Sequence, residues 1–238
     1  MKVSKVLLLD VDGVVCQNPK VFTAIRHKIT HYVRKHMPGR MTLQEASSVN
    51  DIVYKTYGHT LLGLQAVRQK KLPTLDDFNM AIYDQQTLEF LQNNSWNPDM
   101  QKRALEVYDL CEEAKNRNIP IYLFSNAPYQ WCKKVVDILE LKTHLPYENI
   151  LTSDHPVFQD GLLKPNPKVY RTITDYLHHK YQDKTIKFIF VDDSWMNLAP
   201  VIGSTCWTPL HLDNNASCRI DSRWVKTIHS LNEIHPLL

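Results

Sequence analysis

Val6-Leu7-Leu8-Leu9, followed directly by Asp10-Val11-Asp12-Gly13, is the segment from which the architecture of this chain can be worked out. Four consecutive apolar residues are typical of a strand that is buried on both faces, as strands are in parallel sheets. Two carboxylates then stand where that strand ends, and Gly13 allows the chain to turn away sharply. Because a buried carboxylate is costly and two of them repel each other, such a pair needs a cation or a substrate group beside it. The segment therefore predicts a strand that leads into a site of chemistry.

Two further apolar runs resemble the first, and each is followed by polar residues. Residues 119–124 end at Ser125-Asn126, and residues 186–191 end at Asp192-Asp193. Two weaker strand candidates are also present: residues 149–152 and 205–208. Amphipathic helices are predicted between the strands, and this alternation favours an α/β fold with a doubly wound, Rossmann-like parallel sheet.

Three of the predicted helices open at a proline, namely Pro98, Pro128 and Pro167, where the missing backbone N–H costs nothing. Their expected apolar faces are, in chain order, Leu105, Tyr108 and Cys111; Trp131, Val135, Ile138 and Leu139; and Val169, Tyr170, Ile173 and Leu177. These faces are expected to pack on the sheet.

Residues 17–95 break the alternation, because they show helical patterns and no strand-like run. One helix is predicted after Asn18-Pro19, and another after a capping box at Thr42, with Gly58 at its end. A third is predicted after Thr74.

We therefore expect a core of residues 1–16 and 96–238 with an inserted helical cap of residues 17–95. Since the cap follows the first carboxylates directly, we interpret it as a lid over the strand ends. The alternative is that it adds ordinary hydrophobic core.

The composition is that of an ordinary globular protein. The chain has 238 residues, of which 43% are hydrophobic and 22% charged, and a formal net charge of +3, which is too small to indicate nucleic-acid binding. Asp10 and Asp12 interrupt the first apolar run too early for a signal peptide, and no run is long enough to span a membrane. Five dispersed cysteines without a CxxC pair indicate reduced thiols, so we expect a cytoplasmic protein. The sequence leaves the oligomeric state open.

The polar residues that follow the three predicted strands should meet, because the carboxyl ends of parallel strands share one edge of a sheet. This places four carboxylates in one crevice: Asp10, Asp12, Asp192 and Asp193. Oxygen ligands select a hard divalent cation, and we expect Mg²⁺ to be held by these four residues. Lys164, in a loop just before the helix at Pro167, adds a positive charge suited to a phosphoryl group.

These groups suggest a reaction. Asp10 can attack phosphorus and form an acyl phosphate, while Asp12 can protonate the leaving group and then activate water. Lys164 is expected to neutralise phosphate charge, and Ser125 and the Asn126 amide to hold a phosphate oxygen. The expected partner is a small phosphomonoester, with no nucleic acid and no membrane.

In the order and spacing of these motifs the chain resembles the haloacid dehalogenase superfamily of phosphotransferases. The resemblance implies that Asp10 is the nucleophile and that Asp12 is the general acid and base, with its backbone carbonyl on Mg²⁺. It further implies that Ser125 and Lys164 hold phosphate. For the last motif it implies that Asp193 binds the metal directly, that Asp192 supports it, and that Asn197, where many relatives carry an acid, orients Lys164 or Asp193. Members named for dehalogenation lack the second aspartate and the metal, so the resemblance disfavours that activity.

The substrate is predicted from the cap. Residues 54–60, followed by Gly63-Leu64, are similar to a lid segment of the pyrimidine 5'-nucleotidase branch, which implies a nucleoside monophosphate bound by Tyr54 and Tyr57. The alternative is that these tyrosines only pack the end of a helix. Gly13 departs from the branch, which often carries asparagine there. A sugar-phosphate or phosphoglycolate phosphatase, a phosphomutase and a non-catalytic binding protein are the competing readings.

Overall fold

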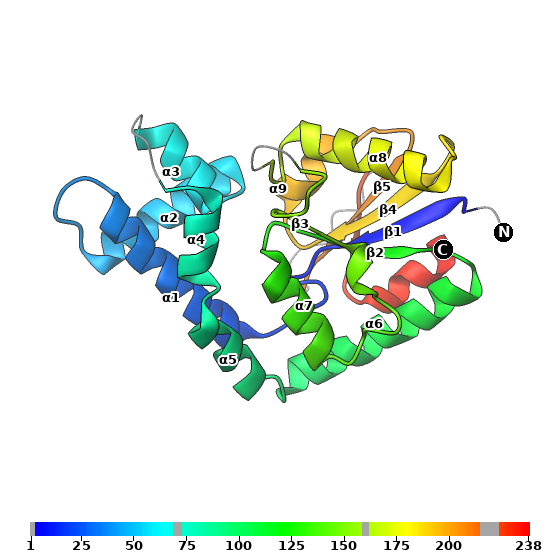
Figure 1. Cartoon of the computed structure of the whole chain (residues 1–238), viewed down its shortest axis with the longest axis horizontal. Coiled ribbons are helices and arrows are strands. Elements are labelled where there is room, and N and C mark those ends of the chain that lie inside the picture. The colour runs from blue at the N-terminus through cyan, green and yellow to red at the C-terminus, as the bar shows by residue number, and fades with distance from the viewer. Residues whose placement is uncertain (1–2, 69–72, 159–161, 215–223) are drawn as a thin grey trace. The chain divides into compact units, whose positions relative to one another are not determined.

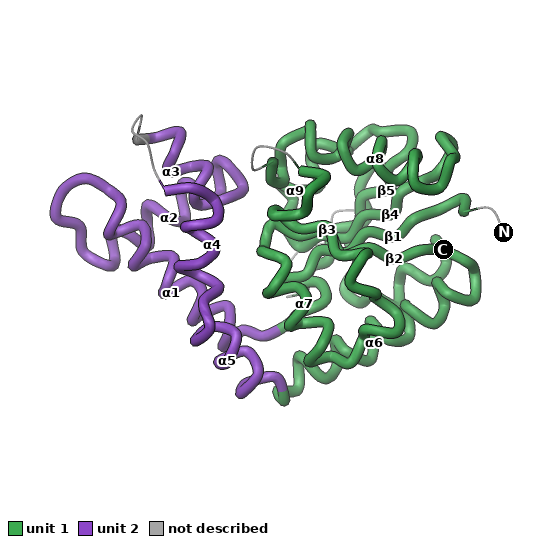
Figure 2. Tube along the Cα trace, viewed as in Figure 1, with its two compact units in different colours: residues 1–17, 96–238 green, residues 18–95 purple. Residues whose placement is uncertain are grey.

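The computed structural model describes residues 3–68, 73–158, 162–214 and 224–238 (Figure 1). The chain divides into two compact units (Figure 2). Unit 1 comprises Met1–Gln17 and Trp96–Leu238, and unit 2 comprises Asn18–Ser95. Each unit is described by itself below.

Unit 1 is built on a parallel sheet with the strand order β3-β2-β1-β4-β5-β6. The strands are β1 (Lys5–Leu9), β2 (Ile121–Ser125), β3 (Ile150–Thr152), β4 (Lys187–Asp192), β5 (Trp207–Leu212) and β6 (Lys226–Ile228). From β1 the chain adds β2 and β3 on one side and then crosses over to add β4, β5 and β6 on the other. β1 therefore lies at the centre, between β2 and β4. The prediction of a doubly wound α/β fold is thus confirmed, and β6 is a further short strand at the edge.

Helices cover both faces of this sheet. In Figure 1, α8 (Pro167–Tyr181) lies on one face, and α6 (Pro98–Asn116) and α7 (Tyr129–Ile138) lie on the other. The short helix α9 (Trp195–Leu198) follows β4, and 3₁₀ turns cover Tyr147–Asn149, Ala199–Val201 and Leu231–Leu237.

The core beneath α8 is rich in aromatic rings. Phe124, Phe188 and Phe190 of the sheet are fully buried there, together with Tyr170 of α8 and Trp207 of β5. The ring centroids of Tyr170 and Trp207 lie 5.6 Å apart in an edge-to-face arrangement. This packing holds the carboxyl ends of β2 and β4 in fixed positions.

The predicted apolar face of α6 was wrong in part. Leu105 and Tyr108 are 68% and 49% exposed, whereas Cys111 is buried. The buried stripe of α6 is Met100, Arg103, Glu106, Val107, Leu110, Cys111 and Ala114. Because two of its members, Arg103 and Glu106, are charged and paired with each other at 3.6 Å, apolar periodicity alone did not reveal it. The buried faces predicted for α8 are confirmed in full.

Unit 2 consists of five helices in its described part: α1 (Pro19–His36), α2 (Leu43–Tyr57), α3 (Thr60–Arg68), α4 (Leu75–Ile82) and α5 (Gln85–Asn93). The predicted caps are present. Thr42 and Glu45 form a reciprocal capping box at the start of α2, and Thr74 forms another with Asp77 at the start of α4. Gly58 ends α2 in the left-handed conformation, with φ 73°.

Two expectations from the sequence concern membrane-spanning helices and the state of the cysteines. No helix within the described ranges combines the length and the apolar character that crossing a bilayer requires. Cys16, Cys111, Cys132 and Cys206 carry free thiols. Cys218 lies outside the described residues.

Candidate active site

The strand ends at the centre of the sheet bring the predicted polar residues together. Leu9 of β1 pairs with Leu123 of β2 and with Val191 of β4, so the residues that follow these positions emerge side by side. Asp10 is one of them, and its backbone N–H donates to the carbonyl of Val191 at 3.0 Å. Ser125 closes β2 and Asp192 closes β4. The carboxyl edge of β2, β1 and β4 is therefore the floor of the candidate active site.

Lys164 reaches into this floor from the loop before α8 and is only 1% exposed. Its Nζ lies 3.0 Å from Asp10 Oδ1 and 2.6 Å from Asp192 Oδ2, and it donates to the Phe124 carbonyl at 2.8 Å. Burial would lower the pKa of this amine, but the charges of Asp10 and Asp192 outweigh burial and raise it. Lys164 is therefore a permanently charged ammonium within the site.

Asp192 is fully buried, and hydrogen bonds occupy both of its oxygens. In addition to Lys164, its carboxylate accepts from the Ser194 backbone N–H at 2.9 Å and from the Asn197 side chain at 3.0 and 3.1 Å. Asn197 therefore orients Asp192, and through Asp192 the ammonium of Lys164. The expected action of Asn197 on Lys164 is thus indirect, through Asp192, and within the described residues no hydrogen bond joins the Asn197 side chain to Asp193.

Carboxyl groups of Asp10, Asp192 and Asp193 offer oxygens that all lie within 4.8 Å of one another. Burial, together with the nearby charges of Asp192 and Asp12, raises the pKa of Asp10 to about 7 despite the opposing charge of Lys164. The pKa of Asp193 is also raised, by removal of water from its carboxyl and by repulsion from Asp192 and Asp10. These carboxyls are thus held at a cost unless protons or a cation compensate their charge.

The donor set fits a hard divalent cation such as Mg²⁺. Asp10 and Asp193 supply carboxylate oxygens, whereas the oxygens of Asp192 are already engaged. Within the described parts of the chain, no backbone hydrogen bond uses the carbonyl of Asp12, which leaves it able to act as a ligand. The side chain of Asp12 does not belong to the cluster. We therefore expect Asp10, Asp193 and the Asp12 carbonyl to hold the ion, with Asp192 beside them.

Gly13 explains why this cluster can be so compact. Its φ is +82°, and a Cβ built on it would lie 2.1 Å from Asp193 Oδ2. Only glycine combines that backbone conformation with so close an approach of a carboxylate. The space that a side chain would need at this position is filled by Asp193.

The carboxyl of Asp12 is held by a tryptophan that the sequence did not single out as functional. The indole Nε1–H of Trp131, in the first turn of α7, donates to Asp12 Oδ1 at 2.8 Å. Burial raises the pKa of Asp12 to about 6, and the hydrogen bond from Trp131 moderates the rise. In the sequence Trp131 appears only as a member of an amphipathic helix face. No feature of the sequence therefore indicates that it contacts Asp12.

Ser125 and Asn126 have different surroundings. The Ser125 hydroxyl is buried and accepts from the Ala127 backbone N–H at 3.1 Å. The Asn126 side chain binds the backbone of Lys164 in both directions, donating to its carbonyl at 2.9 Å and accepting from its N–H at 2.8 Å. The prediction that the Asn126 amide holds a phosphate oxygen is therefore corrected for its side chain, which holds the Lys164 loop against β2.

Two further residues brace the loop that follows β1. Arg103 of α6 donates to the Val14 carbonyl at 3.0 Å and to Asn214 Oδ1 at 2.8 Å. Asn214 in turn donates to the Gly13 carbonyl at 2.8 Å. Both residues are far from the loop in sequence, and neither carries a motif, so sequence reasoning could not find them.

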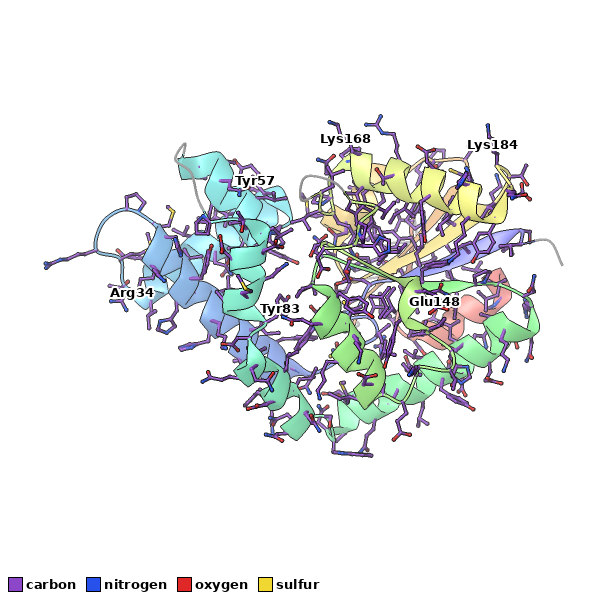
Figure 3. All side chains as sticks on the ribbon, in the orientation of Figure 1. Arg34, Tyr57, Tyr83, Glu148, Lys168 and Lys184 are labelled. Atoms are coloured by element: carbon purple, nitrogen blue, oxygen red, sulfur yellow. The ribbon has the colours of Figure 1, made fainter. Side chains whose placement is uncertain are left out.

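Tyr54 and Tyr57, the predicted substrate-binding tyrosines, belong to unit 2. They lie in the last turn of α2, where Tyr57 is labelled in Figure 3, and are 47% and 37% exposed. The ring of Tyr57 borders Gly63 of α3, whose Cβ would lie 3.0 Å from Tyr57 Cδ2. Part of its surface thus packs the helix pair, as the alternative reading expects, and the rest is open to solvent.

Comparison with solved structures supports the fold of the whole chain. A HAD hydrolase of family IA, variant 3, from Entamoeba histolytica matches with a TM-score of 0.60 and 15% identity over 97% of this chain and 95% of its own. A HAD phosphatase from Thermococcus onnurineus matches with a TM-score of 0.58 and 12% identity, over 98% and 97% of the two chains.

An L-2-haloacid dehalogenase from Xanthobacter autotrophicus matches with a TM-score of 0.54 and 12% identity, over 100% of this chain and 98% of its own. At such identities the likeness shows the fold alone. No curated protein matches the chain. The family model of haloacid dehalogenase-like hydrolases matches residues 4–200, a range that includes the carboxylate cluster, Lys164 and the helices around them. The chain therefore belongs to the haloacid dehalogenase-like hydrolase family.

Proposed function

We propose that the protein is a Mg²⁺-dependent phosphomonoester hydrolase that works through a phosphorylated Asp10. The observation that carries the proposal is the pair of carboxyl groups at the end of β1. Asp10 lies 3.0 Å from Lys164 and in one cluster with Asp192 and Asp193, whereas the Asp12 carboxyl lies outside that cluster and accepts from Trp131. Two acids in different surroundings can take different roles, one as nucleophile and one as acid and base.

In the first half of the reaction, an oxygen of Asp10 forms a bond to phosphorus while the bond from phosphorus to the ester oxygen breaks. Asp12 gives its proton to the departing oxygen. In the second half, Asp12 removes a proton from water, which attacks phosphorus and releases phosphate and the Asp10 carboxylate. A pKa of about 6 places Asp12 close enough to neutrality for both tasks.

The remaining groups manage charge. In this proposal Lys164 offsets the negative charge of the phosphoryl group, and the Ser125 hydroxyl contacts one of its oxygens. When bound, Mg²⁺ supplies electrostatic stabilisation of the charge shared between the nucleophile and the phosphoryl group. Asp192 and Asn197 keep the ammonium of Lys164 pointed at Asp10.

Hydrolysis of p-nitrophenyl phosphate tests this proposal. We expect turnover in Mg²⁺, loss of turnover in EDTA, recovery on adding Mg²⁺ back, and a loss of at least about 10³-fold in Asp10→Asn. Asp175→Asn, a matched change at an exposed position on α8, should leave turnover unchanged. Turnover that survives Asp10→Asn, or chloride release from 2-chloropropionate in place of phosphate release, would refute the proposal.

For the substrate we propose a nucleoside 5'-monophosphate, with a pyrimidine as the base. The support is the similarity of residues 54–60 to the nucleotidase segment and the exposed faces of Tyr54 and Tyr57, which suit stacking on a base. In a panel of nucleotides, sugar phosphates and phosphoglycolate, we expect the highest kcat/KM for pyrimidine nucleotides. Tyr54→Ala should raise KM for these and leave p-nitrophenyl phosphate unaffected. Equal rates on sugar phosphates would remove the nucleotidase assignment, and transfer of phosphate to a sugar rather than water would indicate a mutase.

A further inference from the structure

We infer that Trp131 is a positioning residue, which fixes the carboxyl of Asp12 so that its second oxygen carries the proton to the leaving group. This inference rests on the proposed function, because it assigns a partner to the acid of that reaction. Trp131 itself touches no reacting atom, and nothing in the sequence motifs points to it.

The contact has a defined geometry. Trp131 is completely buried, and its Nε1–H donates to Asp12 Oδ1 at 2.8 Å. Across the described segments, no other hydrogen bond reaches the Asp12 carboxyl, so Oδ2 is left for the proton. An indole is a donor only, which means that it can bind a carboxyl oxygen that lacks the proton but never the O–H oxygen. The bond therefore determines which of the two oxygens serves as the acid.

The indole is also immobile. Trp131 lies in the first turn of α7, and its own backbone N–H donates to the Pro128 carbonyl at 3.1 Å. The start of α7 is anchored by Asp154, whose carboxylate accepts from the Tyr129 N–H at 2.9 and 3.1 Å. A short connection joins Ser125 at the end of β2 to this turn, so the same backbone segment places the phosphate contact and the partner of the acid.

The positioning role predicts a dependence on the leaving group. An alkoxide is a strong base and needs a proton as it departs, whereas p-nitrophenolate departs without one. A variant that leaves Asp12 free to rotate should therefore lose activity on alkyl phosphates and keep it on the aryl ester. A variant that merely loosens the fold should lose both equally.

Trp131→Phe tests this, compared by kcat/KM on p-nitrophenyl phosphate and on the alkyl phosphate of the substrate panel that the wild type hydrolyses fastest, since kcat/KM reports the steps up to departure of the first product. We expect a fall of about 10- to 100-fold with the alkyl ester and less than about threefold with the aryl ester. Inhibition by inorganic phosphate should be unchanged. Because Phe leaves a gap, a second variant carries 3-benzothienylalanine at position 131, which keeps the shape of indole and lacks only the N–H. It should reproduce the selective loss.

Trp207→Phe is the matched control. Trp207 is also buried, and its indole N–H donates to the Thr174 hydroxyl at 3.2 Å, within the core beneath α8. Its replacement should show no leaving-group dependence. If wild type hydrolyses neither ester, the proposed function fails. If wild type is active and Asp12→Asn shows the selective loss while both position-131 variants do not, the inference about Trp131 is overturned and the function stands.

Discussion

Gly13 shows how much one residue can decide at this site. Its positive φ is a conformation that costs an L-residue about 1–2 kcal/mol, and the position of its missing Cβ is filled by Asp193. In Gly13→Ala we expect the methyl group to displace the Asp193 carboxylate from the cluster it forms with Asp10. The apparent Kd for Mg²⁺ in the phosphatase assay should rise about tenfold or more, because a ligand is moved.

Gly203→Ala separates this effect from backbone strain. Gly203 also has a positive φ, of +77°, but a Cβ there meets nothing within 4 Å. Gly203→Ala should lose about 1–2 kcal/mol of stability in urea unfolding and Gly13→Ala at least as much, and only Gly13→Ala should need more Mg²⁺. Equal Mg²⁺ requirements in the two variants would show that Asp193 tolerates the methyl group.

Most of the strands and helices of this fold could be predicted, because their signals are local. Apolar runs located β1, β2 and β4, and N-cap residues located α1, α2 and α4. What failed depended on packing. The three-residue strand β6 has no run of its own to announce it. The buried stripe of α6 includes an ion pair, which reads as a solvated face in the sequence.

The helix pair α2–α3 offers a test in which propensity and packing oppose each other. Replacing Gly63 by Ala in an exposed helix would add about 0.5–1 kcal/mol of stability. Here the new Cβ would lie 2.5 Å from Val53 Cβ and 3.1 Å from the Val53 carbonyl. We expect Gly63→Ala to destabilise unit 2 by about 1–3 kcal/mol through overpacking, as measured by chemical unfolding. Ser48→Ala, at an exposed position of α2, should be neutral or stabilising; a Gly63→Ala protein that gains stability would contradict the close packing.

For the molecule as a whole, the sequence predicts that the acidic residues gather at one edge of the sheet. It does not predict the residues that hydrogen-bond to them. Parallel strands bring their carboxyl ends together whatever the sequence between them, so Asp10 and Asp192 were expected to lie close together. Trp131 and Asn214 reach the site through tertiary packing of a helix and a distant loop. No pattern of neighbours in the chain records such contacts.

The same cluster links stability to pH and to metal. The folded protein raises the pKa of Asp10 from an ordinary 3.8 to about 7, and that of Asp12 to about 6. Folded carboxyls thus bind protons more tightly than unfolded ones, so their contribution is present below pH 3.8 and is lost as pH rises to about 7. The metal-free protein should therefore be destabilised over this range.

Mg²⁺ binds the ionised carboxylates, so its stabilising effect should grow as the protons leave. At about 100 times its Kd it contributes about 2.7 kcal/mol, which corresponds to a rise in Tm of several degrees. In thermal unfolding we expect a larger Mg²⁺ shift at about pH 8 than at about pH 5. Asp10→Asn should raise the metal-free Tm at the higher pH and reduce the Mg²⁺ shift. Identical shifts at both pH values would argue against a carboxylate site for the ion.

The central position of β1 in the sheet has a consequence for folding during synthesis. Its neighbours in the sheet are β2 and β4, whose residues are made long after its own. At about 5–20 residues per second, the apolar segment Val6 to Leu9 is synthesised on the order of ten seconds or more before either neighbouring strand. The apolar segment of β1 thus stays without a neighbouring strand until residues 121–125 have been made, and we expect the nascent chain to be open to chaperone binding during this interval.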